Sequence, residues 1–335
     1  MSSVDVIVPC YRYGRFLREC VKSVLSQSVH DLRVLIIDDE SPDNTAEVAG
    51  DVVKQDPRVT FVRHSTNKGH IATYNEGIDW ACADYMLILS ADDYLLPGAL
   101  SLSTSLMDAY PEVGFTFGRI IRMDDSGATA PTTDVKSKAD FRILTGMQFI
   151  ELSGASNIVA TPTAVVRTAL QKRLGGYRHQ LPHSGDMEMW LRFATHASVG
   201  KINEYQAVYR RHCSNMSIAY LANGWLGDFH QRRAALDCFF EYYTSPSSRQ
   251  LHQRLFWSLA CCAIGCASSA LKEGESEIAD QLSSFALDVC PELRRSLRWV
   301  KFNVKRFVLS RRSARSPIIA SIQDRSASVK DGDKA

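Results

Sequence analysis

The stretch VDVIVPCYRYGRFLRECVKSVLSQSVHDLRVLIIDDESPDNT, residues 4–45, contains the unit that decides the fold. Residues 4–9 form a short β-branched run that ends at a proline, and residues 32–38 form a second, nearly continuous apolar run. Between these runs, apolar residues recur at helical spacing over residues 13–27. The stretch therefore predicts a strand, a helix and a second strand.

The same alternation continues through the first hundred residues. Further strands are expected at 58–64, 84–90 and 113–121, and further helices at 41–53, at 71–82 and from Pro97 onward. Because the expected strands are apolar on both faces, they should form a mostly parallel sheet covered by helices on both sides. Residues 124–140 are polar and rich in Asp, Ser, Thr and Lys, so we expect a flexible loop there.

Composition narrows the class of protein. The net charge of the 335 residues is only +2, so the protein lacks the strongly positive overall charge that would favour nucleic acid as a partner. The nine cysteines form no Cys-x-x-Cys pair, which is typical of reduced thiols rather than a zinc site. The first strand begins too early to leave room for a secretory leader, and the apolar run at 256–271 is short and rich in small residues. We therefore expect a cytoplasmic protein in which that run forms a buried helix.

The C-terminal third has a helical pattern. Residues 221–316 are expected to form a helical region in which two antiparallel helices are joined at Gly274. Residues 294–315 contain nine basic and no acidic residues, with apolar residues at helical spacing. Such a segment is either a solvated surface helix or, as we expect, a helix that lies on an anionic membrane. Residues 317–335 are expected to be disordered.

Chemically active residues follow the ends of the expected strands. The first strand ends at Pro9-Cys10-Tyr11, the second at Asp38-Asp39, the third at His64 followed by Asn67-Lys68-Gly69, and the fourth at Asp92-Asp93. Ligands of open parallel sheets bind at the carboxyl ends of the strands. Adjacent carboxylates also raise each other's pKa unless a cation or a donor lies between them. The pattern predicts a ligand site at this edge of the sheet.

The missing motifs indicate the kind of ligand. Neither Gly-x-Gly-x-x-Gly nor the P-loop sequence follows a strand, so no glycine loop is available for phosphates. A divalent cation on oxygen ligands would neutralise a nucleoside diphosphate instead. The ring of Tyr11 offers a face for a base, and Asp38 or Asp39 can accept hydrogen bonds from a base or a ribose.

Four segments in order carry a resemblance to a known family. They are residues 4–45, NKGHIATYNEGI (67–78), LILSADDYLLPGAL (87–100) and GDMEMWLRFA (185–194). Over residues 3–215 the chain resembles the family 2 glycosyltransferases of GT-A fold. The resemblance implies an inverting transfer from a nucleotide-activated sugar, usually with Mg²⁺ or Mn²⁺. It also implies a GT-A domain over residues 1–220, in which 1–118 bind the nucleotide sugar and 119–220 bind the acceptor.

The resemblance assigns roles in donor binding. Pro9, Tyr11 and Asp39 would hold the base with Asp38 close by, while Lys68 and Gly69 would lie along the nucleotide.

The family's Asp-x-Asp motif corresponds to Ser90-Ala91-Asp92-Asp93, with a serine where many members have the first aspartate. One of Asp92 and Asp93 would bind the cation and the other the ribose, and which does which stays open. His212 would lie by the metal or diphosphate, with Arg210 or Arg211 offsetting phosphate charge, although a lone histidine after a strand is often structural.

Inversion by direct displacement requires a base on the acceptor side. The matched motif makes Asp186 that general base, although an aspartate at the start of a helix is also a common N-cap. Glu188 is the nearest rival, and it is more simply read as solvent-facing or structural. Trp190 and Trp225 are most simply core residues.

Together these features predict an enzyme that moves one sugar, from a UDP-sugar in our expectation, to a hydroxyl of a glycan or lipid-linked acceptor in cell-envelope or exopolysaccharide synthesis. Single transfer is expected because the Gln-x-x-Arg-Trp motif of processive relatives is missing. One alternative is a sugar-phosphate nucleotidyltransferase, which needs a glycine- and arginine-rich loop after its first strand. A phospho-acceptor receiver domain and a non-catalytic sugar-binding scaffold are the alternatives from other classes.

Overall fold

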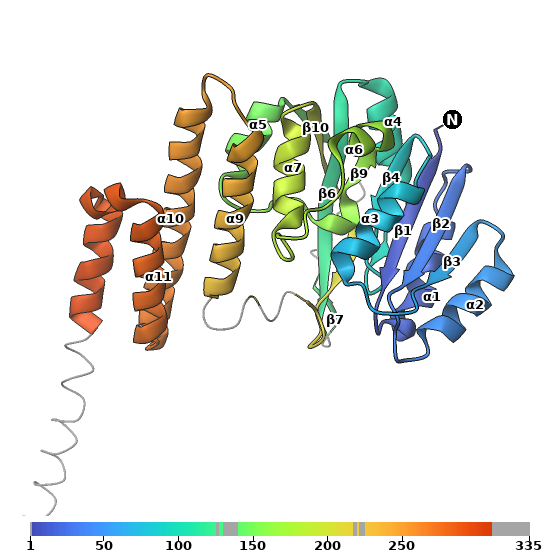
Figure 1. The fold of residues 1–335 in the computed structure, drawn as a ribbon, viewed down its shortest axis with the longest axis horizontal. Coiled ribbons are helices and arrows are strands. Elements are labelled where there is room, and N and C mark those ends of the chain that lie inside the picture. Colours follow the sequence, from blue (N-terminus) through green and yellow to red (C-terminus); the bar gives the residue numbers. More distant parts are fainter. Residues whose placement is uncertain (1, 125–126, 130–139, 217–219, 221–224, 310–335) are drawn as a thin grey trace, which may run out of the picture. The chain divides into compact units, whose positions relative to one another are not determined.

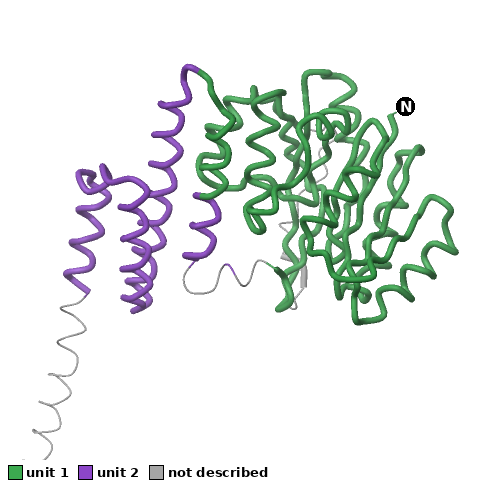
Figure 2. Tube along the Cα trace, viewed as in Figure 1, with its two compact units in different colours: residues 1–218, 234–245 green, residues 219–233, 246–335 purple. Residues whose placement is uncertain are grey.

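The computed structural model describes residues 2–124, 127–129, 140–216, 220 and 225–309. The chain divides into two compact units, which Figure 2 distinguishes by colour. Unit 1 comprises residues 1–218 and 234–245, and unit 2 comprises residues 219–233 and 246–335. Each unit is described by itself.

Unit 1 is built on a ten-stranded sheet with the order β3-β2-β1-β4-β9-β6-β10-β5, with β7 paired to β6 and β8 paired to β10. Strands β1 to β4 are mutually parallel, as the apolar runs predict, whereas β9, β5, β7 and β8 join antiparallel. The strands are β1 (Val4–Cys10), β2 (Leu32–Asp38), β3 (Val59–Arg63), β4 (Tyr85–Ile88), β5 (Tyr94–Leu95), β6 (Val113–Asp124), β7 (Gly127–Thr129), β8 (Phe141–Leu144), β9 (Val165–Arg167) and β10 (Ser198–Arg210).

Helices cover both faces of this sheet, so the mixed α/β class expected from the sequence is confirmed (Figure 1). The helices of unit 1 are α1 (Gly14–Leu25), α2 (Thr45–Gln55), α3 (His70–Trp80), α4 (Ala99–Ala109), α5 (Gly146–Ser153), the 3₁₀ turn η1 (Thr161–Thr163), α6 (Thr168–Leu174) and α7 (Gly185–Ala194). Helices α1, α2 and α4 share one buried core with alternate residues of β1 and β2. The ring of Phe115 in β6 stacks on Trp190 of α7. Helix α3 packs beside α6, and α5 packs beside α7.

The residue pattern explains how closely these layers pack. Leu17, Cys20, Val21 and Val24 are buried on one stripe of α1, which is the helical spacing read from the sequence. On the other face, a Cβ at Gly77 of α3 would lie 2.3 Å from the side chain of Ile7. Only a glycine allows α3 to approach β1 this closely, and α3 carries several residues of the candidate site.

The segment expected to be a flexible loop, residues 124–140, is partly a strand. β7 pairs antiparallel with the end of β6, so that expectation is wrong for residues 127–129. Hydrogen bonds to the neighbouring strand fix a polar segment there that has no apolar pattern of its own. The remainder of the segment, residues 125–126 and 130–139, lies outside the described residues.

Unit 2 is helical. Its elements are the first part of α9 (Leu226–Tyr242), then α10 (Ser248–Glu273), α11 (Ser276–Val289), the 3₁₀ turn η3 (Pro291–Arg295) and a helix over residues 297–309. α10 and α11 pack side by side, and Gly274 ends α10 in the left-handed region with φ 86° (Figure 1). The predicted helical pair joined at Gly274 is therefore confirmed.

Helix α10 is longer than the apolar run that predicts it. By length and composition it could cross a membrane, since an 18-residue window has a mean hydropathy of 1.4. Half of that window is buried inside the protein, as in the core helix of many soluble proteins. Trp225, expected in the core, is 45% exposed and has φ 75°, so that expectation is wrong. Residues 310–335, which include the end of the basic segment and the predicted disordered tail, lie outside the described residues.

Candidate active site

The strand register brings the acidic strand ends together. Cys10 at the end of β1 pairs with Asp38 at the end of β2, and Asp38 pairs with Arg63 at the end of β3. On the other side of β1, Ile88 pairs with Ile7. The chain after β4 stays beside β1, because Leu89 N donates to the carbonyl of Ile7 and Ala91 N donates to that of Pro9.

Pro9 lies between the segment that leads to Asp38 and the segment that leads to Asp92. Its carbonyl holds Ala91, one residue before Asp92, while its own position in the ladder is opposite Ile37, one residue before Asp38. A proline has no N–H to offer to β4, so pairing with β4 weakens at this point. The chain can then turn away from the sheet at the place where the paired carboxylates begin.

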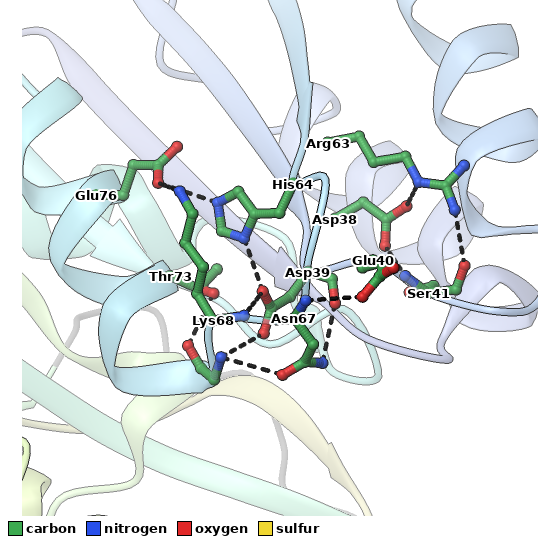
Figure 3. A network of polar contacts seen from close by, with 11 residues as sticks. Asp38, Asp39, Glu40, Ser41, Arg63, His64, Asn67, Lys68, Thr73 and Glu76 are labelled. Carbon is green, nitrogen blue, oxygen red and sulfur yellow. Dashed lines mark hydrogen bonds and ion pairs between the residues drawn. The ribbon is translucent and has the colours of Figure 1, made fainter.

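Asp39 lies in a small cradle of donors at the end of β2 (Figure 3). Its Oδ1 accepts a hydrogen bond from Lys68 N at 2.7 Å and lies 2.7 Å from His64 Nδ1, and its Oδ2 accepts one from Gly69 N at 2.9 Å. Gly69 adopts φ 83°, which an L side chain rarely does, just before α3 begins. The glycine thus allows two successive backbone N–H groups to point at one carboxylate.

His64 links this cradle to α3. Its Nε2 lies 3.0 Å from Glu76 Oε2, which also accepts a hydrogen bond from Lys68 Nζ at 3.0 Å (Figure 3). Burial acts to raise the pKa of Glu76, but the hydrogen bonds from Lys68 and His64 outweigh it and lower that pKa. Lys68 is therefore tied to α3 by its side chain and to Asp39 by its backbone.

Asp38 is fully buried and shapes the neighbouring turn. Its Oδ1 accepts a hydrogen bond from Ser41 N at 2.8 Å, and its Oδ2 forms an ion pair with Arg63 Nε at 3.3 Å. Arg12 and Glu40, in the loops after β1 and β2, have φ values of 63° and 62°. Backbone strain of this kind is concentrated at functional sites.

Tyr11, which follows β1, is 43% exposed. It follows Cys10, which pairs with Asp38, so this exposed residue lies next to the Asp38–Asp39 turn.

Asp92 is buried and meets a segment far away in sequence. Its Oδ2 accepts a hydrogen bond from Asn215 Nδ2 at 3.1 Å and lies 3.1 Å from His212 Nε2. Ser214 N donates to Nδ1 of the same histidine at 3.3 Å. A donor on Nδ1 makes that nitrogen the acceptor, so Nε2 carries the proton that points at Asp92.

The donor set around Asp92 fits a hard divalent cation that is shared with a substrate. Among the described residues, no three His, Cys, Asp or Glu side chains lie close enough together to hold a metal alone. Mg²⁺ is commonly held by one or two carboxylates, with phosphate and water oxygens supplying the remainder, and Mn²⁺ also takes such oxygen ligands. Asp92 is such a carboxylate, and His212 Nε2, 3.1 Å from Asp92 Oδ2, would be a second, nitrogen ligand once it has lost its proton.

Asp93 contacts the end of β10. Its Oδ1 accepts a hydrogen bond from Arg210 N at 2.9 Å, which ties β10 to the acidic turn. Burial raises the pKa of Asp93 well above its ordinary value, and the charge of Asp92 raises it further. The Arg210 side chain pairs with Glu19 and lies over the rings of Phe16 and Tyr94.

Asp186 lies in the first turn of α7, two residues after Ser184. Ser184 occupies the N-cap position, so the alternative of an N-cap role for Asp186 is wrong. The Thr161 hydroxyl donates a hydrogen bond to Asp186 Oδ2 at 2.5 Å. Burial raises the pKa of Asp186, while that hydrogen bond and the charges of His183 and His70 act in the opposite direction. A carboxylate with a raised pKa is a stronger base when it is ionised.

Tyr74 lies on α3, the helix that follows the cradle of Asp39. Burial raises the pKa of Tyr74, and the charges of Asp186, Asp92 and Asp93 raise it further, in that order. Its ring also meets that of Tyr177 at 5.3 Å between centroids. This ring contact and the 2.8 Å contact of His70 Nε2 with the carbonyl oxygen of Pro182 tie α3 to the segment that precedes α7.

Glu188, the rival base, is fully buried, so of its two expected positions, solvent-facing or structural, the structural one is observed. It accepts hydrogen bonds from Arg192 Nη2 and the Tyr242 hydroxyl, both at 2.9 Å, and forms an ion pair with Arg178 at 3.2 Å. Trp190 is a core residue as expected.

Sequence reasoning did not find several residues of this region. Thr161 and Asn215 carry no motif of their own and reach the site only through packing of distant segments, whereas Tyr74 lies within the quoted segment 67–78 but was not singled out. His64 and Lys68 were placed at the correct strand end, but their shared partner Glu76 lies within a helix and looked like an ordinary surface residue.

Comparisons with known proteins agree with this arrangement. The sequence profile described as "Glycosyl transferase family 2" matches residues 5–174. One curated relative, the GalNAc(5)-diNAcBac-PP-undecaprenol beta-1,3-glucosyltransferase of Campylobacter jejuni, is 32% identical over 122 residues, which are 36% of this chain and 39% of the relative. Two other curated glycosyltransferases match over 26% and 30% of their lengths. The matches thus span well under half of these relatives.

Two solved structures share the fold. Staphylococcus aureus TarS 1–349 in complex with UDP-GlcNAc has a TM-score of 0.56 at 14% identity, covering 88% of this chain and 92% of that one. The Pyrobaculum calidifontis mannosyltransferase PcManGT with GDP-Man and Mn²⁺ has a TM-score of 0.55 at 16% identity, covering 92% and 85%. The fold is that of GT-A glycosyltransferases, and with the profile match over half of the sequence, the chain belongs to glycosyl transferase family 2.

Proposed function

We propose that this glycosyltransferase moves one sugar, with inversion, from a UDP-sugar to a hydroxyl of a glycan or lipid-linked acceptor. The observation that carries the proposal is the start of α3, where Gly69 N donates to Asp39 Oδ2 at 2.9 Å and His70 Nε2 lies 2.8 Å from the carbonyl oxygen of Pro182, four residues before Asp186. A base and a phosphate-binding group must flank the reacting carbon in a displacement of this kind.

In the proposed reaction, Asp186 accepts the proton of the attacking hydroxyl. The acceptor oxygen forms a bond to the anomeric carbon while the bond from that carbon to the diphosphate oxygen breaks, and the electron pair leaves with the diphosphate. Thr161 keeps Asp186 Oδ2 hydrogen-bonded, so the direction of the carboxylate is set before the acceptor arrives. Glu188 holds α7 from its buried side.

Asp92 and His212 would hold a Mg²⁺ or Mn²⁺ ion, with Asp93 supporting the turn through Arg210 N. When bound, such a cation supplies positive charge to the leaving diphosphate. The Mn²⁺ bound together with GDP-Man in the Pyrobaculum mannosyltransferase supports a metal in this fold. In this assignment Asp92, rather than Asp93, is the direct ligand, and Asp93 is left for the ribose side or for structure.

The cradle of Asp39 favours uracil over guanine. A carboxylate has about four acceptor positions, and three are used by Lys68 N, Gly69 N and His64. One position remains, which suits the single N–H of uracil, whereas guanine presents two neighbouring donor groups. The exposed ring of Tyr11 supplies a stacking face next to it.

The acceptor class is proposed by likeness. The Campylobacter relative is named for a diphospho-undecaprenol-linked substrate, which supports a lipid-linked or glycan acceptor here. Such an acceptor would be met at the cytoplasmic face of a membrane, in synthesis of a cell-envelope polysaccharide.

A binding panel tests the proposal. Thermal unfolding of the full chain is measured with UDP-, GDP-, CMP- and dTDP-sugars, each with Mn²⁺ and with EDTA. We expect stabilisation by UDP-sugars that depends on Mn²⁺, and a loss of this effect in Asp92→Asn. Equal stabilisation by GDP-sugars would contradict the base assignment, and stabilisation by no sugar nucleotide would leave a non-catalytic scaffold as the better account.

A further inference from the structure

The helix over residues 297–309 has apolar side chains on two opposite sides. On its inner side Phe302 is 1% exposed and lies against Trp299, with ring centroids 5.7 Å apart. Lys305 Nζ donates to the carbonyl of Ser268 in α10, and Arg306 forms a 2.9 Å ion pair with Asp280 in α11. This side fixes the helix within unit 2.

The side chains on the opposite side are largely exposed. Five large apolar side chains there, which we call the outer stripe, are between 44% and 77% exposed: Leu297, Val300, Val304, Phe307 and Val308. Their spacing places them on one strip of the helix roughly 100° wide. Among the described residues, 13 large apolar side chains are exposed, and five of them lie on this one short helix. Scattered apolar residues are ordinary on a surface, but a contiguous stripe marks an interaction site.

Basic residues lie next to the outer stripe. The exposed side chains of Arg298 and Lys301 lie on the same helix, and those of Arg294 and Arg295 lie on η3 just before it. No acidic residue occurs in the sequence from 293 to 315. Asp280 is already paired with Arg306, and the carboxylate of Glu292 accepts a hydrogen bond from the Cys290 thiol.

The geometry points to a docking surface for an anionic lipid membrane, with the outer stripe lying in the plane of the interface. Apolar side chains enter the boundary between head groups and acyl chains, and the adjacent basic side chains meet the anionic head groups. The inner side already packs against unit 2, so the helix would lie on the membrane and not cross it.

A second copy of this chain fits the surface less well. A symmetric pair places the same patch of each copy against the other. Arg298 and Lys301 would then face their own counterparts without acidic partners in the sequence around them. The charges therefore favour a surface of opposite sign.

Vesicle flotation tests the inference, and it does not depend on the proposed transfer reaction. The full chain is mixed with vesicles of phosphatidylcholine alone or of phosphatidylcholine and phosphatidylglycerol in equal parts. A stripe variant, V304S with F307S, is compared with a matched surface variant, M147S with L152S, in which two exposed apolar residues of unit 1 are changed. A charge variant, R298Q with K301Q, completes the set, and thermal unfolding verifies that each variant is folded.

We expect wild type and the matched surface variant to float with anionic vesicles and not with neutral ones. The stripe variant should lose flotation, and the charge variant should bind roughly fivefold more weakly for each basic residue removed. Flotation by the stripe variant equal to wild type would overturn the inference, as would equal flotation on neutral vesicles. Resistance to carbonate extraction would also overturn it and indicate an embedded helix such as α10. A dimer lost in the stripe variant, without vesicle binding, would indicate a second copy instead.

Discussion

The hydroxyl of Thr161 lies 2.5 Å from Oδ2 of Asp186 and donates a hydrogen bond to it. This contact joins η1 to the first turn of α7, two elements that are 25 residues apart in the sequence. It is also the largest influence that lowers the pKa of Asp186 against the effect of burial. The Thr161 hydroxyl therefore lowers the pKa of the carboxylate that we propose as the general base.

Removing that hydroxyl should move the pH dependence of activity. In Thr161→Val the pKa of Asp186 rises further, because a pKa-lowering contact is lost while burial remains. The base acts when ionised, so the acidic limb of kcat/KM should shift to higher pH. Thr161→Ser keeps the hydroxyl and should retain the wild-type profile. An unchanged pH profile of kcat/KM in Thr161→Val would show that this hydrogen bond does not influence the catalytic base.

Asp186→Asn should retain donor binding and lose transfer. General-base catalysis contributes about 10²- to 10⁴-fold, so kcat should fall by that order while the thermal stabilisation by the donor remains. Asp79→Asn, at an exposed aspartate of α3, serves as the control and should keep full turnover. Substantial turnover by Asp186→Asn would assign the proton to another group.

Asp93→Asn should stabilise the protein while impairing its activity. The folded-state pKa of Asp93 is raised, so its carboxylate opposes folding above the unfolded pKa, and this cost disappears as the pH falls below that value. Asparagine keeps an acceptor for Arg210 N without the charge beside Asp92. At neutral pH in EDTA we expect a gain of about 1 kcal/mol, or roughly 2–4 °C in Tm. A lower Tm than wild type would mean that the charge is already compensated.

The buried Glu188 group should behave as structural support for α7. Glu188→Gln leaves the nearly buried Arg192 without a counter-charge and should cost about 3 kcal/mol or more of folding free energy. Tyr242→Phe removes one hydrogen bond to the same carboxylate and should cost about 1 kcal/mol. Denaturant titration measures both, and turnover at low temperature should persist in Tyr242→Phe. The reverse order of the two costs would contradict the proposed role.

Much of the sheet could be predicted, because the information is local. Each parallel strand is a short apolar run, and the rule that ligands bind at the carboxyl ends of such strands brings Asp39 and Asp92 to one edge without any knowledge of packing. The register through Pro9 bears this out.

The partners of these carboxylates could not be predicted, because they depend on contacts between distant segments. The family resemblance placed His212 by the metal or diphosphate, but its 3.1 Å contact with Asp92 across 120 positions of sequence depends on the path of β10. Asp39 is held mainly by backbone N–H groups, which every residue except proline possesses and no sequence pattern reveals. Glutamate is usually exposed on a protein surface. Glu188 is buried because it forms ion pairs with two arginines and accepts a hydrogen bond from a tyrosine.

The outer stripe has a practical consequence for purification of this protein. Exposed apolar rows favour self-association at the concentrations used for crystallisation, so wild type should elute less cleanly from a sizing column than the stripe variant, V304S with F307S. Shortening the chain before Leu297 would not give the same improvement, because it would also remove the buried Phe302. Self-association of this protein in detergent-free buffer would therefore be a consequence of the same stripe that we propose binds a membrane.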